Sequence, residues 1–455
     1  MTKTKSLGTN FTSGPIMPML LKFFLPFLAA NALNNLYNTV DTIIIGQFLG
    51  SFGIVAVSMG GKMLNLYTIV STSLAAGGQV LISQHIGAGK RKELNPTIGN
   101  LFTELLSISV IFAVLTFIFG EELLRLINTP EESMAGALSY LRITSLGLPL
   151  VFGYNAVSSV LRGMGDSRSP LLFIAIATVL NTVLDIVFIT VFDMGVAGTA
   201  LATVLGQGVS LVFSLSLLYR RRESFGFDFR LRSFKPQWRR MALLLKLGLP
   251  LSMRGVFIIG TQLYMLSFIN ACGVAAAAAY NISDKIYHIA NIFAISVREA
   301  GGTIVAQNIG AEKLDRVKKT VRSVAIVSFS AAAIMAIPSV LFPNFIFSMF
   351  TSDPEVLSQA RIFMLICCII YFLSAAIAPY EGVVSGTGNA KLGFLGGMLD
   401  GVVFRVGFCL LFGLALGMGA VGFFLGDALA RTGIVLVGAI YYHSGKWKSY
   451  RILPK

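Results

Sequence analysis

Charged residues are scarce in this sequence: 13% of the 455 residues are Asp, Glu, Lys or Arg, whereas 55% are hydrophobic. Soluble domains usually carry about 25% charged residues. The mean hydropathy of +0.77 and apolar runs longer than about 18 residues predict transmembrane helices and exclude a large soluble domain. Because those runs are continuous and not alternating, they also argue against a membrane β-barrel.

Cysteine and histidine are also rare, with four and three residues respectively. No group of them has the spacing of a metal site, and disulfides are not expected. No Gly-Lys pair lies in a phosphate-binding loop, which argues against direct ATP hydrolysis. The sequence therefore favours a protein that is not an enzyme and needs no cofactor.

The apolar runs predict an all-α integral membrane protein with twelve transmembrane helices. Several runs exceed the roughly 20 residues that span a bilayer, so these helices are expected to tilt or bend. The expected segments are 16–49, 52–86, 98–120, 136–161, 170–192, 195–219, 242–270, 274–309, 323–347, 358–384, 392–416 and 418–442.

The net charge of +15 raises the question of nucleic-acid binding, but the distribution of the charge argues against it. Most Lys and Arg residues fall in alternate loops and near the termini, for example in 90–92, 220–222 and 446–455. Positive charge concentrates on the cytoplasmic side of membrane proteins. We therefore expect a cell-membrane protein with both termini in the cytoplasm, whose basic loops contact anionic lipids.

An internal repeat divides the chain into two halves. Motifs in the first half recur in the same order about 224 residues later: "LLKFFLP" as "LLKLGLP", "QHIGAGK" as "QNIGAEK", and "GMGD" as "GTGN". The repeat predicts an N-lobe of residues 1–219, a cytoplasmic linker of residues 220–241 and a C-lobe of residues 242–455. Six helices per half predict two bundles related by a pseudo-twofold axis along the membrane normal, working together as a monomer.

Acidic and amide residues inside the N-lobe helices are the main functional candidates. Asp41 and Asp185 each lie eight residues before the outer end of a predicted helix, and Thr203 lies eight residues after the outer start of another. At about 1.5 Å per residue, all three are expected about 12 Å below the outer surface. Asn181 and Asn38 lie about one turn further inward, beside Asp185 and Asp41 respectively.

This set predicts an oxygen-rich site for a coupling cation. Oxygen ligands suit hard cations, and two carboxylates in a low dielectric favour uptake of a proton or Na+. A Na+ site would use Asp41, Asn181, Asp185 and Thr203. The alternative is that these groups are structural, hydrogen-bonded between helices, but acids inside membranes are costly and usually functional.

The repeat replaces this site in the C-lobe with charges of both signs. Asn181 corresponds to Arg405 and Thr203 to Asp427, which predicts a structural ion pair between Arg405 and Asp427. Other acids and bases are equally numerous there, so one interpretation is a self-neutralised network. The alternative is a second proton or substrate site. The candidates for lining a substrate cavity are Tyr37, Asn155, Arg298, Glu299 and Glu381.

The motifs "LYNTVD", "LRGMGDSRSP" and "QNIGAEKLDRV", in this order, resemble the multidrug and toxic compound extrusion (MATE) family over essentially the whole chain. The resemblance implies proton- or sodium-driven export of small organic, often cationic, compounds. Asp41, Asn181, Asp185 and Thr203 match the cation site of DinF-type members, and Pro26 matches the proline at which their first helix bends. Flippases of lipid-linked compounds in the same superfamily leave export of lipid-linked or anionic compounds as the alternative.

Overall fold

The computed structural model describes residues 9–450 and 452, which form helices joined by turns without any strand. The α-helices are α1 (Ile16–Gly87), α2 (Leu94–Leu126), α3 (Glu131–Leu146), α4 (Leu148–Gly163), α5 (Arg168–Thr190), α6 (Gly195–Arg220), α7 (Arg222–Phe225), α8 (Trp238–Ala271), α9 (Val274–Gly310), α10 (Leu314–Leu341), α11 (Pro343–Ser348), α12 (Pro354–Thr387), α13 (Ala390–Met398), α14 (Arg405–Cys409), α15 (Gly419–Ala430) and α16 (Thr432–His443). Short 3₁₀ segments are η1 (Arg91–Glu93), η2 (Leu231–Phe234) and η5 (Lys446–Lys448), and π-helical segments are η3 (Leu399–Phe404) and η4 (Leu410–Ala415).

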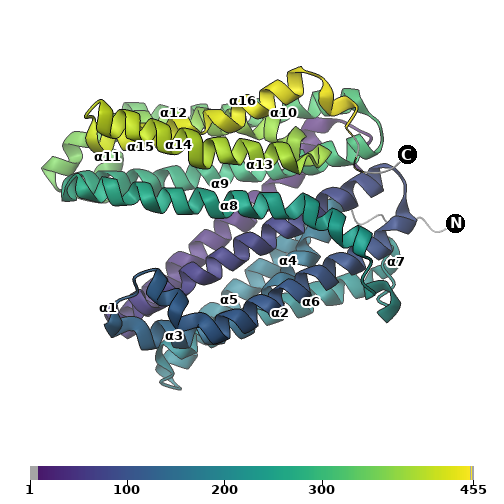
Figure 1. The fold of residues 1–455 in the computed structure, drawn as a ribbon, viewed down its shortest axis with the longest axis horizontal. Coiled ribbons are helices and arrows are strands. Elements are labelled where there is room, and N and C mark those ends of the chain that lie inside the picture. Colours follow the sequence, from purple (N-terminus) through teal and green to yellow (C-terminus); the bar gives the residue numbers. More distant parts are fainter. Residues whose placement is uncertain (1–8, 451, 453–455) are drawn as a thin grey trace. The chain divides into compact units, whose positions relative to one another are not determined.

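The predicted number of transmembrane spans is confirmed within the described residues. Ten helical segments are long and apolar enough to cross a membrane, and α3 with α4, bent by 49°, forms an eleventh. Helix α1 contains two spans, because Gly50 interrupts it with φ 64° and ψ −161°, where the chain reverses direction (Figure 1). A glycine adopts this backbone conformation without strain. Counting both halves of α1 gives 11 + 1 = 12 spans.

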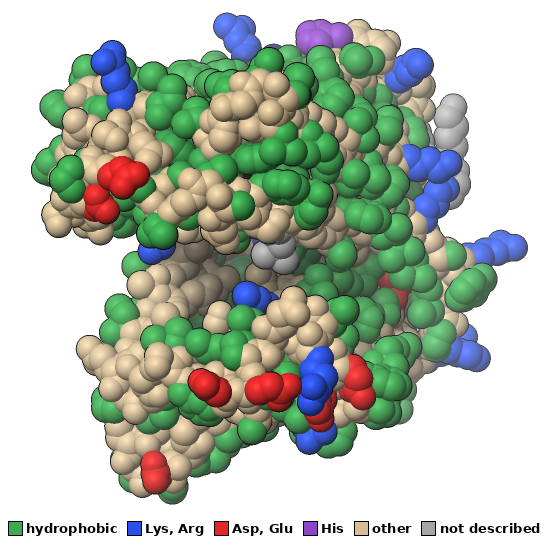
Figure 2. All heavy atoms as spheres, turned by 60° about the vertical axis from the view of Figure 1, so that its left-hand side comes forward, with side chains coloured by type: hydrophobic (Ala, Val, Ile, Leu, Met, Phe, Trp, Pro, Cys, Tyr) green, Lys and Arg blue, Asp and Glu red, His purple; other side chains and the backbone are tan. Residues whose placement is uncertain are grey.

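Large hydrophobic side chains are exposed along the helices, as expected for surfaces that face lipid. On α2 they include Leu106, Val110, Val114 and Phe117, each about half exposed. Figure 2 shows hydrophobic side chains over much of the visible face and few charged ones among them. Soluble monomeric proteins rarely expose apolar surface on this scale. The protein is thus a multi-pass membrane protein.

The chain forms two compact units, but their boundary differs from the predicted one. Among the described residues, one unit comprises residues 9–10 and Leu25–Ser252, and the other comprises Phe11–Phe24, residues 253–450 and residue 452. The segment 220–241, predicted as the cytoplasmic linker, packs within the first unit. The first turns of α1 belong to the second unit, and the first turns of α8 belong to the first unit. Each unit's first long helix therefore begins in the other unit.

Both crossings occur beside prolines that are equivalent in the repeat. Helix α1 passes between units at Leu25, next to Pro26, and α8 passes at Met253, three residues after Pro250. A proline inside a helix removes one backbone hydrogen bond and crowds the preceding turn. Both helices remain continuous through their prolines. The prolines thus lie at the two places where a helix leaves one packed core for the other.

In the second unit, the segment before α1 is held by the end of α9 and the start of α10. The backbone N–H of Phe11 donates to Gln307 Oε1 at 3.1 Å, and its carbonyl accepts from Asn308 Nδ2 at 3.2 Å. The Arg316 guanidinium donates at 2.8 Å to the carbonyls of both Phe11 and Gly14. The repeated motif "QNIGAEKLDR" therefore works as an anchor for the incoming chain.

In the first unit, the end of the equivalent motif and the start of α2 hold the segment before α8. Asn95 Nδ2 donates to Ser233 Oγ at 3.1 Å, and the Gln237 N–H donates to Asn100 Oδ1 at 2.7 Å. Arg240 pairs with Glu93 at 2.8 Å. These bonds explain why residues 220–241, despite their polar composition, pack against the first unit.

Gly99 on α2 gives a direct test of this anchoring. A Cβ at Gly99 would overlap the carbonyl oxygen of Ser233, whereas a Cβ at Gly61 on α1 would meet nothing within 4 Å. We expect Gly99→Ala to lower the free energy of unfolding by about 1–3 kcal/mol, because rigid backbone must move. Gly61→Ala should be neutral or slightly stabilising, since alanine favours a helix. Thermal unfolding of both purified variants checks this, and equal melting temperatures would contradict it.

Candidate functional site

Four of the predicted residues come from three helices of the first unit. Asn181 and Asp185 lie one turn apart on α5 and are 3% and 0% exposed. Asp41 on α1 is half-buried, and its carboxyl group lies close enough to that of Asp185 for the two charges to interact. Thr203 on α6 donates to the Thr199 carbonyl at 3.0 Å. The α5–α6 pair packs tightly, with Asn181 against Gly206.

Two tyrosines complete this group. The phenol groups of Tyr37 on α1 and Tyr140 on α3 interact with Thr203 and lie in the field of Asp41 and Asp185. Tyr37 was predicted only as a residue of the substrate cavity. Tyr140 was not predicted at all, because a single tyrosine in an apolar helix gives no signal in the sequence.

Five polar atoms of this group lack hydrogen-bond partners within the described protein. They are Asp41 Oδ1, both carboxylate oxygens of Asp185, and both side-chain polar atoms of Asn181. Buried polar groups are almost always hydrogen-bonded, and an unpaired buried carboxylate is costly. Four of the five atoms are acceptor oxygens, and oxygen ligands of this kind suit a proton or a hard cation.

Three other predicted residues lie outside this group. Asn38 is exposed, and its backbone carbonyl accepts a hydrogen bond from Thr42 Oγ1 at 2.8 Å. Asn155 on α4 is buried and donates to Ser71 Oγ on α1 at 3.0 Å. That bond fits the interhelical alternative for Asn155. Pro26 lies at the crossing of α1 between units.

In the second unit, charged side chains form two ion-pair clusters. Arg405 pairs with Asp427 and lies 3.2 Å from Asp400, while Arg431 lies 3.1 Å from Asp427. In the other cluster, Glu381 accepts from Arg254 and, at 3.0 Å, from Arg298. All members of the first cluster are buried.

These clusters bear on the candidates for the substrate cavity. Glu381 is held between two arginines, so its carboxylate is balanced by neighbouring charge. Glu299 is 35% exposed and only 3.8 Å from Arg298, which is a weak contact. The arginines themselves, including Arg298, line a cavity of about 140 Å³ within the second unit.

Glu104 on α2 is a buried acid that sequence reasoning missed. Its side chain is 2% exposed, and neither carboxylate oxygen has a hydrogen-bond partner among the described residues. A single acid in the middle of a predicted span was the available signal. Glu104 does not share the distance from a helix end that grouped Asp41 with Asp185 and Thr203, so no partner for it could be predicted from the sequence.

Two units of six spans, with unpaired acids inside one and arginines around a cavity in the other, define a membrane transporter built by duplication. The MatE family matches residues 26–187 and 250–396, more than half of the chain, and the chain belongs to this family. "Probable multidrug resistance protein YpnP" of Bacillus subtilis is 29% identical over 98% of this chain and 99% of its own.

Further relatives extend the comparison. "Probable multidrug resistance protein NorM" of Thermotoga maritima is 26% identical, covering 96% of this chain and 94% of its own. The solved structure of a MOP superfamily transporter from Pyrococcus furiosus has the same fold, with a TM-score of 0.89 over 99% of both chains at 20% identity. The expected family and fold class are confirmed.

Proposed function

We propose that the protein is a secondary antiporter that exports organic compounds, cationic or amphipathic, in exchange for inward-moving protons or sodium ions. The coupling ion binds at Asp41, Asn181, Asp185 and Thr203. The observation that carries this proposal is the set of buried, unpartnered polar atoms on Asp41, Asn181 and Asp185. A transporter of this kind needs no resident cofactor.

Coupling follows from charge. Two ionised carboxylates close together inside the membrane are costly, and binding of a proton or Na+ reduces their charge. If the ion and the organic substrate prefer different states of alternating access, each shifts the population toward the state that releases the other. Tyr37 and Tyr140, which interact with Thr203, are placed to position the hydroxyl group toward the ion.

The membrane setting of the proposal follows from charge distribution. The basic segments at 90–92, 220–222 and 446–455 support an orientation with the loops that contain them, and both termini, in the cytoplasm. The group around Asp41 then lies nearer the outer surface, where an incoming cation first meets it. The two units belong to one chain, so the working form is a monomer in the cell membrane.

Reconstituted liposomes test the function. Export of a fluorescent cationic dye is measured with an inward pH gradient, an inward Na+ gradient, or neither. We expect one gradient to drive dye export against its concentration and the other to do less, which identifies the ion. Equal dye movement with and without gradients, or in protein-free liposomes, would contradict antiport.

Export of lipid-linked or anionic compounds is the second candidate. It is favoured by one observation, the four arginines around the cavity of the second unit. A cavity lined by four arginines and one acid presents more donors to an anion than acceptors to a cation, even though acids outside the lining also pair with the arginines.

A further inference from the structure

We propose that the cavity of the second unit binds the anionic group, a phosphate or a carboxylate, of an amphiphilic substrate. For its biological meaning this rests on the second candidate function, export of lipid-linked or anionic compounds, but binding itself requires no gradient. Four arginines line the cavity, and Asp400 is the one acid among its lining residues. The arginines are Arg254, Arg298, Arg405 and Arg431.

The acids that pair with these arginines leave many donors free. Each guanidinium carries five N–H groups. Arg254 and Arg298 each make their hydrogen bond to Glu381 through one terminal nitrogen, and Glu381 does not line the cavity. Arg405 Nε is buried without a partner among the described residues, on a side chain only 2% exposed. Planar forks of this kind match phosphate and carboxylate oxygens.

A π-helical segment sets the geometry of one wall. Asp400 and Arg405 are five residues apart, a spacing that places side chains on different faces of an α-helix. Segment η3 (Leu399–Phe404) is π-helical, with i to i+5 bonding, and brings Arg405 to 3.2 Å from Asp400. π-helical segments are rare and often lie at functional sites. Asp400 therefore orients Arg405 toward the cavity.

A glycine one turn before Asp400 sets the position of Arg254. The side chain of Arg254 crosses Gly397 so closely that a Cβ there would overlap its methylene carbons. A larger residue at position 397 would therefore displace the side chain of Arg254 from its place beside the cavity. The continuous helical run of α13 and η3 thus fixes both Arg254, through Gly397, and Arg405, through Asp400.

The first unit has no such arginines. At the repeat spacing, Arg254 and Arg298 correspond to Ala30 and Leu74, and Arg405 and Arg431 correspond to Asn181 and Gln207. A cavity lined by arginines at these four positions is therefore specific to the second unit. Ion pairs that only stabilise a helix bundle can lie anywhere in it. The position of four arginines around a single cavity is not explained by stabilisation alone.

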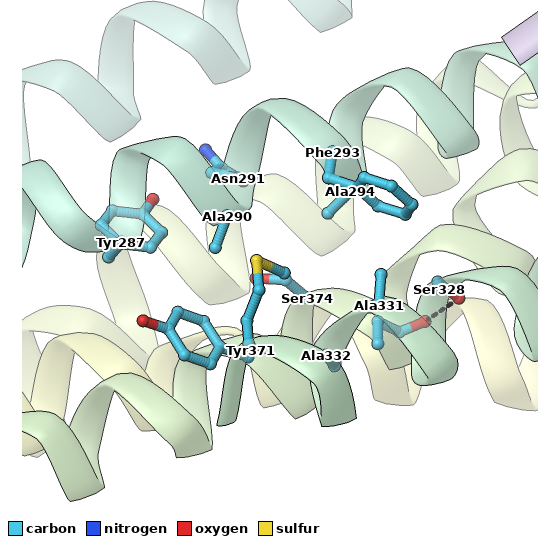
Figure 3. A pocket seen from close by; sticks show the side chains of 12 residues that line it. Tyr287, Ala290, Asn291, Phe293, Ala294, Ser328, Ala331, Ala332, Tyr371 and Ser374 are labelled. Carbon is cyan, nitrogen blue, oxygen red and sulfur yellow. Dashed lines mark hydrogen bonds between the residues drawn. The ribbon is translucent and has the colours of Figure 1, made fainter. Parts of the chain in front are cut away.

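The size and surroundings of the cavity fit the head of an amphiphile. Its volume of about 140 Å³ is on the order of ten times what one water needs. A smaller, mainly apolar pocket between α9, α10 and α12 shares Tyr287, Asn291, Ala294 and Ser374 with it (Figure 3). Figure 3 shows Tyr287 and Phe293 on one side of this pocket and Tyr371 with Ala332 on the other. The smaller pocket, of about 10 Å³, has room for about one water, so the larger cavity holds the anionic head and the smaller pocket only extends its wall.

Equilibrium binding to the full-length purified protein tests the inference. Isothermal titration calorimetry in dodecyl maltoside compares a short-chain monoacylglycerol phosphate with the same monoacylglycerol lacking the phosphate. We expect the phosphate to bind and its uncharged analogue to bind at least about tenfold more weakly. Arg298→Gln and Gly397→Ala should weaken phosphate binding about tenfold, the second without any change of charge. Arg361→Gln, at an exposed arginine of α12, is the matched control and should bind like wild type.

The remaining arms separate folding, ligand source and transport. The double variant Arg254→Gln/Glu381→Gln keeps the net charge, so loss of binding in a folded double variant supports the site. Competition by inorganic phosphate indicates that a small anion suffices, and failure to compete indicates a lipid head group; both support an anionic site. Asp41→Asn should keep phosphate binding even where transport is lost. Equal binding of both monoacylglycerol probes, or cavity variants that match Arg361→Gln, would overturn the inference.

Discussion

Asp41→Asn is expected to reduce gradient-driven dye export to the level of protein-free liposomes while leaving the protein folded. The asparagine keeps the shape of the side chain but cannot exchange a proton and binds Na+ more weakly than a carboxylate does. It also removes the charge that interacts with Asp185. Export is measured under whichever gradient drives the wild type, together with thermal unfolding of the same preparations.

The thermal measurement separates a functional role of Asp41 from a structural one. Asp41 Oδ1 has no hydrogen-bond partner in the described protein, so the amide breaks no bond to that atom. A melting temperature equal to or above that of wild type is therefore expected, because a costly buried charge is removed. Asp193→Asn is the control, at an exposed acid beyond the end of α5 with φ 51°, where asparagine is well tolerated. Normal export by Asp41→Asn would exclude Asp41 from coupling.

Helix register explains why some site residues could be predicted from the sequence. Asp41, Asp185 and Thr203 lie at matching distances from helix ends, and a regular rise per residue converts such distances into depth. Their approach in the structure follows from that register. Asn38 failed to join them because nearly one turn leaves an angular offset, which directs its side chain to the exposed side of α1.

Long-range packing explains what the sequence could not predict. The repeat relates Arg405 and Asp427 to Asn181 and Thr203, so their pairing could be inferred by analogy. Glu381 is 127 residues from Arg254 and has no such template. The exchange of first helical turns between units also leaves no local pattern, since it depends on anchors such as Arg316 far along the chain.

The second large effect is expected at Asp427, the shared acid of the buried cluster. Asp427→Leu leaves Arg405, 2% exposed, with Asp400 alone and deprives Arg431 of its carboxylate. Removing one partner of a buried ion pair typically costs about 3–5 kcal/mol, since a buried charge loses its compensation. We expect a loss of that size in unfolding free energy. Thermal or denaturant unfolding of the purified variant measures it.

Arg405→Lys gives a graded version of the same test. A guanidinium reaches Asp427 through one terminal nitrogen and Asp400 through the other, whereas an ammonium is a single point of charge. The lysine is therefore expected to keep one acid and lose the other, with a smaller loss of stability than Asp427→Leu. Glu355→Gln, at an exposed acid of α12, should change stability by less than about 0.5 kcal/mol. If Asp427→Leu had the same free energy of unfolding as Glu355→Gln, the ion-pair cluster would not contribute to stability. Its arginines would then be present for ligand binding in the cavity.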